Sequence, residues 1–70
     1  MTEDEVRDKW MKLFPDFVEE FKISKKDIRV SRFPSGRFNL IIITWDRKGH
    51  GSTIEYDYDP VDDIFYHFPD

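Results

Sequence analysis

The longest apolar stretch of the chain is residues 38–45, Phe-Asn-Leu-Ile-Ile-Ile-Thr-Trp, in which two residues are polar. β-branched and aromatic residues are enriched in strands, and a nearly continuous apolar run of this length is typical of a strand without a solvent-facing side. We therefore expect a central strand over about residues 38–46. Because side chains alternate along a strand, its apolar side chains divide between two faces, with Phe38, Leu40 and Ile42 on one and Ile41, Ile43 and Trp45 on the other.

An amphipathic helical pattern precedes this strand. Thr2 and Glu5 have the spacing of a capping box, in which each side chain accepts a hydrogen bond from the other residue's backbone N–H. Pro15 interrupts the pattern, because proline is unfavourable inside a helix but is tolerated at the first helical position. The sequence thus predicts a kinked helix in two pieces, at about 3–13 and 15–21, that face the same core. Apolar residues at steps of three and four form the predicted buried face: Val6, Trp10, Leu13, Phe14, Phe17, Val18 and Phe21.

Two further segments, at about residues 27–33 and 53–59, have the alternation of half-buried strands, and residues 64–68 form a short last strand or an extended tail. Proline, glycine, serine and aspartate gather between these segments, as is typical of turns. The predicted fold is a single α+β domain over residues 1–70. In it, a kinked N-terminal helix packs on a three- to four-stranded antiparallel meander.

A single helical layer covers one face of a sheet, so the second apolar face of the central strand needs a different cover. The sheet could curl so that the C-terminal aromatic residues Phe65, Tyr66 and Phe68 protect it. The face could instead pair with its own copy in a two-fold dimer. Thirdly, it could bind another protein, because an exposed apolar patch of this kind usually marks an interaction site. The residues concerned are Ile41, Ile43 and Trp45.

Composition favours a soluble protein without membrane contact, for which we expect a cytoplasmic location. The chain has 70 residues, a net charge of −4 and no cysteine, which excludes disulfides and suits a reducing compartment. The acidic N-terminus lacks the features of a secretory signal, and no apolar run approaches the roughly 20 residues that span a bilayer. Seven Phe, three Tyr and two Trp are many rings for so short a chain, which favours some of them lying at an interface.

Charge is unevenly distributed along the chain. The stretch at 22–37 contains one acid, Asp27, and it is otherwise basic. Bases with phenylalanine nearby are a pattern that can bind single-stranded nucleic acid. The whole domain is acidic, however, which is atypical of a nucleic-acid binder, so a nucleic-acid-binding module is the alternative interpretation. The residues that would carry it are Lys22, Lys25, Lys26, Arg29, Arg32 and Arg37.

The stretch at 53–70 is acidic and contains no Lys or Arg. Acids at every second position of a strand stand in a row, about 6.8 Å apart, and like charges so close do not stabilise a fold. We interpret the row as a surface for a basic partner, in which carboxylates take the place of nucleic-acid phosphates and charge steers the encounter. The predicted acidic surface comprises Glu55, Asp57, Asp59, Asp62 and Asp63.

No motif in the chain indicates a catalytic, cofactor-binding or metal site. The two histidines could pair with carboxylates, His50 with Asp46 and His67 with Asp70, but neither pair has a metal-ligand spacing. Gly49 lies in a loop with neighbouring bases, yet the loop lacks the spacing of a phosphate-binding motif and no helix follows it. A chain this short rarely builds both a core and a substrate pocket.

We therefore expect a non-catalytic protein–protein interaction domain. Its sharper form is a small acidic inhibitor or adaptor that mimics nucleic acid and presents a carboxylate-lined strand to a basic, nucleic-acid-binding partner. Small acidic domains of this style are common among phage and mobile-element proteins, an analogy that concerns style alone.

Overall fold

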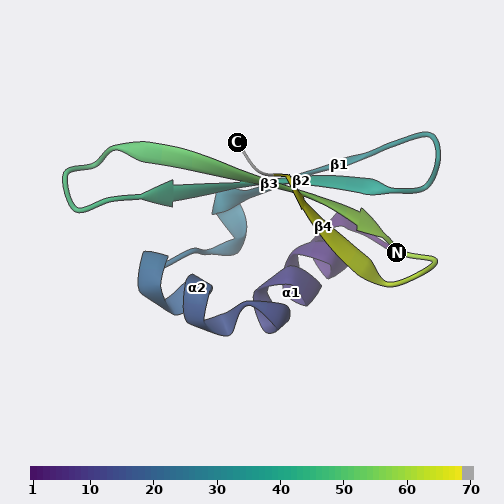
Figure 1. Ribbon diagram of the computed structural model, residues 1–70, viewed down its shortest axis with the longest axis horizontal. Helices are drawn as coiled ribbons and strands as arrows, with labels where there is room; N and C mark the ends of the chain where they lie inside the picture. Colours follow the sequence, from purple (N-terminus) through teal and green to yellow (C-terminus); the bar gives the residue numbers. More distant parts are fainter. Residues whose placement is uncertain (69–70) are drawn as a thin grey trace.

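Two helices lie as a layer beneath a four-stranded sheet in the computed structural model, which describes residues 1–68 (Figure 1). The helices are α1 (Glu3–Leu13) and α2 (Pro15–Phe21). A short 3-10 helix, η1 (Lys25–Asp27), then leads into strands β1 (Ile28–Arg32), β2 (Phe38–Trp45), β3 (Gly51–Asp59) and β4 (Ile64–Phe68). The predicted α+β class is confirmed, with four strands in the meander.

The two helices begin and end where the sequence signals predict. The Thr2 hydroxyl accepts a hydrogen bond from the Glu5 N–H at 3.2 Å, and the Glu5 carboxylate accepts one from the Thr2 N–H at 3.0 Å. Phe14 leaves the helical region at φ −126° and ψ 56°, and Pro15 starts the second helix. Within residues 1–68, no helix combines the length and the apolar character that crossing a membrane requires.

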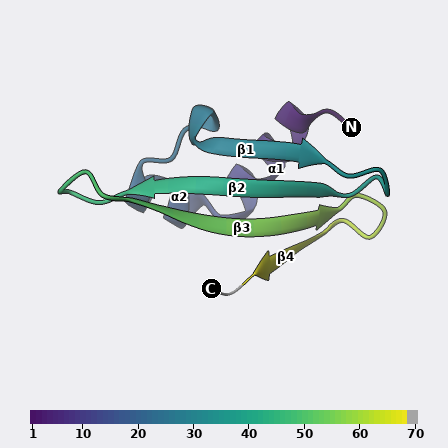
Figure 2. The ribbon, with the colours of Figure 1, turned by 90° about the horizontal axis from the view of Figure 1, so that it is seen from above.

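All neighbouring strands of the sheet are antiparallel and lie in chain order, β1-β2-β3-β4 (Figure 2). β2 is paired along its full length with β3, whose first residues extend two positions before the predicted start at 53. η1 was not predicted from the sequence. It forms because Asp27 accepts hydrogen bonds from both the backbone N–H and the hydroxyl of Ser24.

The hydrophobic core lies between the helical layer and one face of the sheet. Trp10 is fully buried at its centre, where its ring contacts those of Phe14, Phe17 and Tyr56 at centroid distances of 5.2, 6.1 and 5.8 Å. Aromatic pairs at such distances stabilise beyond the area that they bury. The buried residues include the first predicted face of the central strand: Val6, Trp10, Ile23, Ile28, Phe38, Leu40, Ile42 and Tyr58.

Leu13 departs from the predicted buried face of the helix, since 56% of its surface is exposed. It is the last residue of α1, and the bend between α1 and α2 is the part of the helical layer farthest from the sheet (Figure 1). At this bend Phe14 packs inward, with its ring 5.4 Å from that of Tyr56 on β3, whereas the neighbouring Leu13 side chain is left exposed. Phe21, at the end of α2, is also exposed.

Two identical substitutions should therefore differ in cost. Leu40→Ala removes a fully buried side chain from the middle of the sheet, and we expect it to lower the free energy of unfolding by about 2–5 kcal/mol. Leu13→Ala should cost at most about 1 kcal/mol, because less apolar area is lost. Urea denaturation followed by circular dichroism measures both values. Equal losses would contradict the placement of Leu13.

Candidate functional site: the open face of the sheet

One face of the sheet carries no covering layer in the described part of the chain (Figures 1 and 2). Paired residues of neighbouring strands project from the same side of a sheet, so the strand register identifies the residues of this face. We call it the open face. It comprises Arg29 and Ser31 from β1, Asn39, Ile41, Ile43 and Trp45 from β2, Thr53, Glu55 and Asp57 from β3, and Tyr66 and Phe68 from β4.

The apolar part of the open face follows β2. Ile41 and Ile43 are half-buried, and Trp45 is 54% exposed. The Trp45 ring lies over Gly51, its partner on β3, and a Cβ at Gly51 would come within 3.0 Å of the indole. Glycine therefore lets the indole lie against the sheet.

The C-terminal aromatic residues do not form a cover for this face. Phe65 turns to the opposite side, where its ring lies 4.4 Å from that of Tyr58. Tyr66 and Phe68 lie on the open face and remain exposed. They widen the apolar surface at its β4 side.

Glu55 and Asp57 stand on the same face as these apolar side chains, and Asn39 joins them. The Asn39 side-chain amide nitrogen lies 2.7 Å from a Glu55 carboxylate oxygen and 3.1 Å from one of Asp57. A donor shared between two carboxylates offsets part of their repulsion. Nothing in the local pattern predicts this role; the available signal is that Asn39 is a polar residue early in an apolar strand.

Asp59 and Asp63 have structural partners and are not part of the open acidic pair. Asp59 is 8% exposed, and its carboxylate accepts the Val61 N–H at 2.9 Å and contacts Arg37 at 3.4 Å. The Asp63 carboxylate accepts the Tyr58 hydroxyl at 2.6 Å and pairs with Lys9 at 2.9 Å.

These contacts set the protonation of Asp63. The hydrogen bond from Tyr58, followed by that from Lys9, lowers the pKa of Asp63 below its ordinary value of 3.8. Burial, followed by the bond to Asp63, raises the pKa of the Tyr58 hydroxyl. Asp62 lies exposed in the same turn. The five predicted acids therefore divide into an open pair on the sheet, two acids with partners in the fold, Asp59 and Asp63, and the exposed Asp62.

Three of the six predicted basic residues, Lys25, Lys26 and Arg29, line one cavity beside η1 together with Asp4 and Arg7, and the other three do not line it. Lys25 lies between the carboxylates of Asp4 and Asp8, at 3.0 and 2.9 Å, on the helical side of the molecule. Arg32 donates to the Met1 carbonyl oxygen at 2.6 Å.

The remaining bases differ in their contacts. Arg37 pairs with Asp59, and Lys22 ends α2 in a left-handed conformation at φ 52°. Lys26 is exposed on η1, whereas Arg29 is exposed on the open face and makes no ion pair within residues 1–68. Arg29 shares a face with Glu55 and Asp57, and the Arg37 guanidinium also lies over a residue of that face, 5.9 Å from the ring centroid of Tyr66.

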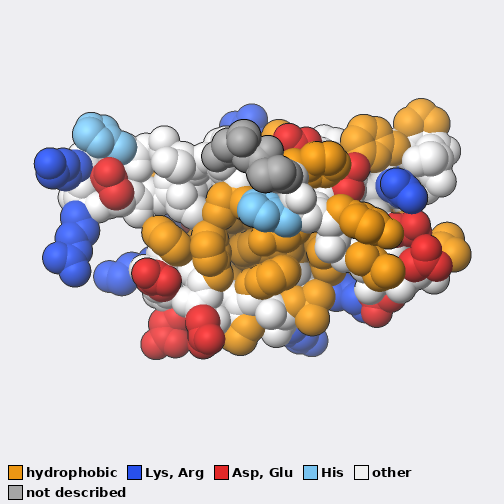
Figure 3. Space-filling view, in the orientation of Figure 1, with side chains coloured by type: hydrophobic (Ala, Val, Ile, Leu, Met, Phe, Trp, Pro, Cys, Tyr) orange, Lys and Arg blue, Asp and Glu red, His pale blue; other side chains and the backbone are white. Residues whose placement is uncertain are grey.

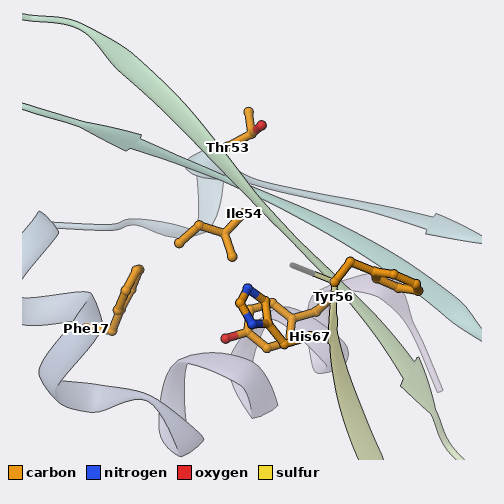
Figure 4. A pocket seen from close by; sticks show the side chains of 6 residues that line it. Phe17, Thr53, Ile54, Tyr56 and His67 are labelled. Atoms are coloured by element: carbon orange, nitrogen blue, oxygen red, sulfur yellow. The ribbon is translucent and has the colours of Figure 1, made fainter. Parts of the chain in front are cut away.

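A cleft lies between β3, β4 and α2, and it is lined by Phe17, Thr53, Ile54, Tyr56, His67 and Phe68. In Figure 3, hydrophobic side chains gather between the sheet and the helices on this side. The cleft has a volume of about 260 Å³, and His67 stacks on Tyr56 there with centroids 4.9 Å apart (Figure 4). Small-molecule sites usually span about 300–1,000 Å³, so the cleft is smaller than a typical ligand pocket.

The histidines have no ligand cluster around them in the part of the chain that the structure describes. His50 Nδ1 lies 3.5 Å from an Asp46 carboxylate oxygen, and Asp46 also accepts the backbone N–H groups of Lys48 and His50 at 2.9 and 2.8 Å. Asp46 therefore shapes the β2–β3 loop. No three His, Cys, Asp or Glu side chains within residues 1–68 come together to hold a metal ion. Asp70, the predicted companion of His67, lies outside the described residues.

The Asn39 bridge, formed by the hydrogen bonds from the Asn39 amide to Glu55 and Asp57, should stabilise the folded protein. Asn39→Ala leaves two carboxylates side by side without their donor, and we expect the free energy of unfolding at neutral pH to fall by about 1 kcal/mol. About 1 M NaCl should recover part of the loss, because salt screens exposed charges. The double variant Asn39→Ala/Glu55→Gln should also recover it. A loss that neither salt nor the second substitution reduces would contradict the proposed relief of repulsion.

Asp63 generates a prediction about pH. Because its pKa is lowered in the folded protein, its contribution to stability is complete above the ordinary value of 3.8 and is lost as pH falls through the folded value. Asparagine tolerates the left-handed backbone conformation of residue 63. Asp63→Asn therefore preserves the turn and removes only the ionisable carboxylate. Urea denaturation should show a difference between wild type and Asp63→Asn at pH 7 that shrinks below about pH 4.

The control for this experiment is Tyr58→Phe, which removes the hydroxyl that donates to Asp63. In that background, Asp63→Asn should change the pH profile less. A difference between wild type and Asp63→Asn that stays constant with pH would contradict the assignment.

No protein-family model matches the chain, and searches of curated proteins and of solved structures found no match either. The open face is the candidate functional site, because a central apolar strip, the carboxylates of Glu55 and Asp57, and Arg29 lie together on it.

Proposed function

We propose that this protein is a non-catalytic protein-binding domain whose contact surface is the open face. The observation that carries the proposal is the meeting of two predicted surfaces, since Ile41, Ile43 and Trp45 share this face with Glu55 and Asp57. Aromatic and aliphatic anchors with charge around them are typical of protein interfaces, in which the apolar centre provides affinity and the charges provide orientation.

The partner's contact surface is basic. Glu55 and Asp57 make no ion pair within the described residues, and Asn39 holds both carboxylates at the surface. Lysine or arginine side chains of a partner would complete them. Trp45 is the anchor that we expect to lose most area on binding, because tryptophan is enriched among the residues that dominate binding energy.

In its sharper form, the domain is an acidic inhibitor or adaptor that occupies a nucleic-acid-binding groove. Glu55 and Asp57 stand at alternate positions of β3, about 6.8 Å apart along the strand, and their carboxylates would take the place of phosphates. The Asn39 bridge supports this form, because it fixes the carboxylates before a partner arrives and so reduces the entropy lost on binding.

Affinity capture from the source cell tests the proposal. The open-face variant is Glu55→Gln/Asp57→Asn, and the matched control is Glu19→Gln/Asp16→Asn, which removes the same two residue types from exposed positions of α2. We expect wild type and control to retain a basic protein that rising NaCl releases, and the open-face variant to lose it. Retention of that protein by the open-face variant would contradict the proposal.

The alternative, a nucleic-acid-binding module, makes the opposite prediction. If the protein binds mixed DNA and RNA with a steep salt dependence, phosphate contacts dominate its binding. Neutralising Lys25, Lys26, Arg29 and Arg32 should then abolish this salt dependence. That result would contradict binding through the acidic surface and support a nucleic-acid-binding module.

A further inference from the structure

Arg29 and Glu55 occupy equivalent positions on either side of β2. The register pairs Arg29 of β1 with Ile41 of β2, and Ile41 with Glu55 of β3, so the three stand in one row across the open face. Neither charged residue makes an ion pair within residues 1–68, and Glu55 accepts a hydrogen bond from Asn39. The row therefore consists of a positive, an apolar and a negative side chain, in the order Arg29, Ile41 and Glu55.

Such a row is complementary to itself under one symmetry operation. Neighbouring strands lie about 4.8 Å apart, so Arg29 and Glu55 are displaced by about that distance to opposite sides of Ile41. A two-fold axis that runs parallel to β2 above Ile41 places β1 of one copy over β3 of the other. Arg29 of each copy then faces Glu55 of the other copy, and the two Ile41 side chains face each other.

We propose that a second copy of this chain occupies the open face in this parallel, two-fold arrangement. The inference rests on the proposed function, because it uses the open face as a protein-binding surface. An axis perpendicular to the strands would instead place Arg29 against Arg29 and Glu55 against Glu55. The charges of the row therefore select one of the two face-to-face dimers.

The side chains suit the separation between packed sheets. Two packed sheets lie about 10 Å apart, and their strands cross at about 30°. This crossing displaces Arg29 and Glu55, which lie about 4.8 Å from the axis, by only about 2.5 Å from the position directly opposite each other. Arginine reaches across this gap and binds a carboxylate through two parallel N–H donors. Ile41 and Ile43, both half-buried in the single chain, would form the apolar centre.

The second copy and the basic partner would use the same carboxylates. Arg29 of the mate takes the place that a partner's lysine or arginine would take on Glu55. Self-association therefore competes with partner binding, and substitution of Arg29 should weaken the first without weakening the second.

Sedimentation equilibrium on a charge-swap series tests the dimer. We expect wild type to be a dimer, and Arg29→Glu and Glu55→Arg each to weaken dimerisation by at least about tenfold, since each places like charges together twice. The double variant Arg29→Glu/Glu55→Arg should dimerise again. Lys26→Glu, at an exposed position outside the open face, should leave dimerisation unchanged. Recovery in the double variant cannot come from a general effect on folding.

Cross-linking supplies an independent measure of the geometry. The chain has no cysteine, so Ile41→Cys introduces a single thiol next to the proposed axis. A short bis-maleimide should join two copies of Ile41→Cys efficiently and two copies of Lys26→Cys poorly.

Three results would overturn the dimer: a wild type that is monomeric up to about 1 mM, single variants that dimerise like wild type, or a double variant that stays monomeric. A monomeric wild type that still captures a basic protein through Glu55 and Asp57 overturns the dimer and supports the proposed function. A dimer that obeys the charge swap, in a protein that captures nothing, supports the dimer and contradicts the basic partner.

Discussion

β2 has two apolar faces, and the chain provides one helical layer to cover them. Phe38, Leu40 and Ile42 lie under that layer and are buried, whereas Ile41, Ile43 and Trp45 point to the other side. Apolar area exposed to water is unfavourable at roughly 25 cal/mol per Å², so the open face favours any association that covers it.

The helical layer is fixed to the sheet mainly by aromatic contacts around Trp10. A domain of this size buries only about 60% of its unfolded surface, and large rings compensate because each removes much area from water. A second attachment lies at the β3–β4 turn, where Lys9 of α1 and Tyr58 of β3 both reach Asp63. Asp63 thus connects the two layers, whereas the side-chain hydrogen bonds of Glu55 and Asp57 go to Asn39 within the sheet.

Local sequence patterns predicted the fold closely, because helix caps, Pro15 and strand alternation act over a few residues. They placed both helices and the first three strands, left residues 64–68 as either a short strand or an extended tail, and divided the side chains of β2 correctly between its faces. Leu13 was misplaced because its burial depends on the path of the helix away from the sheet, which periodicity does not describe.

The site was less predictable, because its features depend on which residues of distant segments stand side by side. The row of Arg29, Ile41 and Glu55, and the bridge from Asn39, follow from the strand register. Likewise, the sequence predicts a single acidic surface from the run of acids. In the folded chain, Asp59 and Asp63 have partners within the fold.

The two tryptophans lie in opposite environments, with Trp10 enclosed by rings and Trp45 resting on the bare backbone of Gly51. The fluorescence of Trp10 thus depends on the packing of the interior, and that of Trp45 depends on contacts made with the open face. Emission from Trp45 is open to collisional quenchers in the isolated chain, and emission from Trp10 is shielded from them. Intrinsic fluorescence can therefore follow docking and unfolding as separate signals, without an added label.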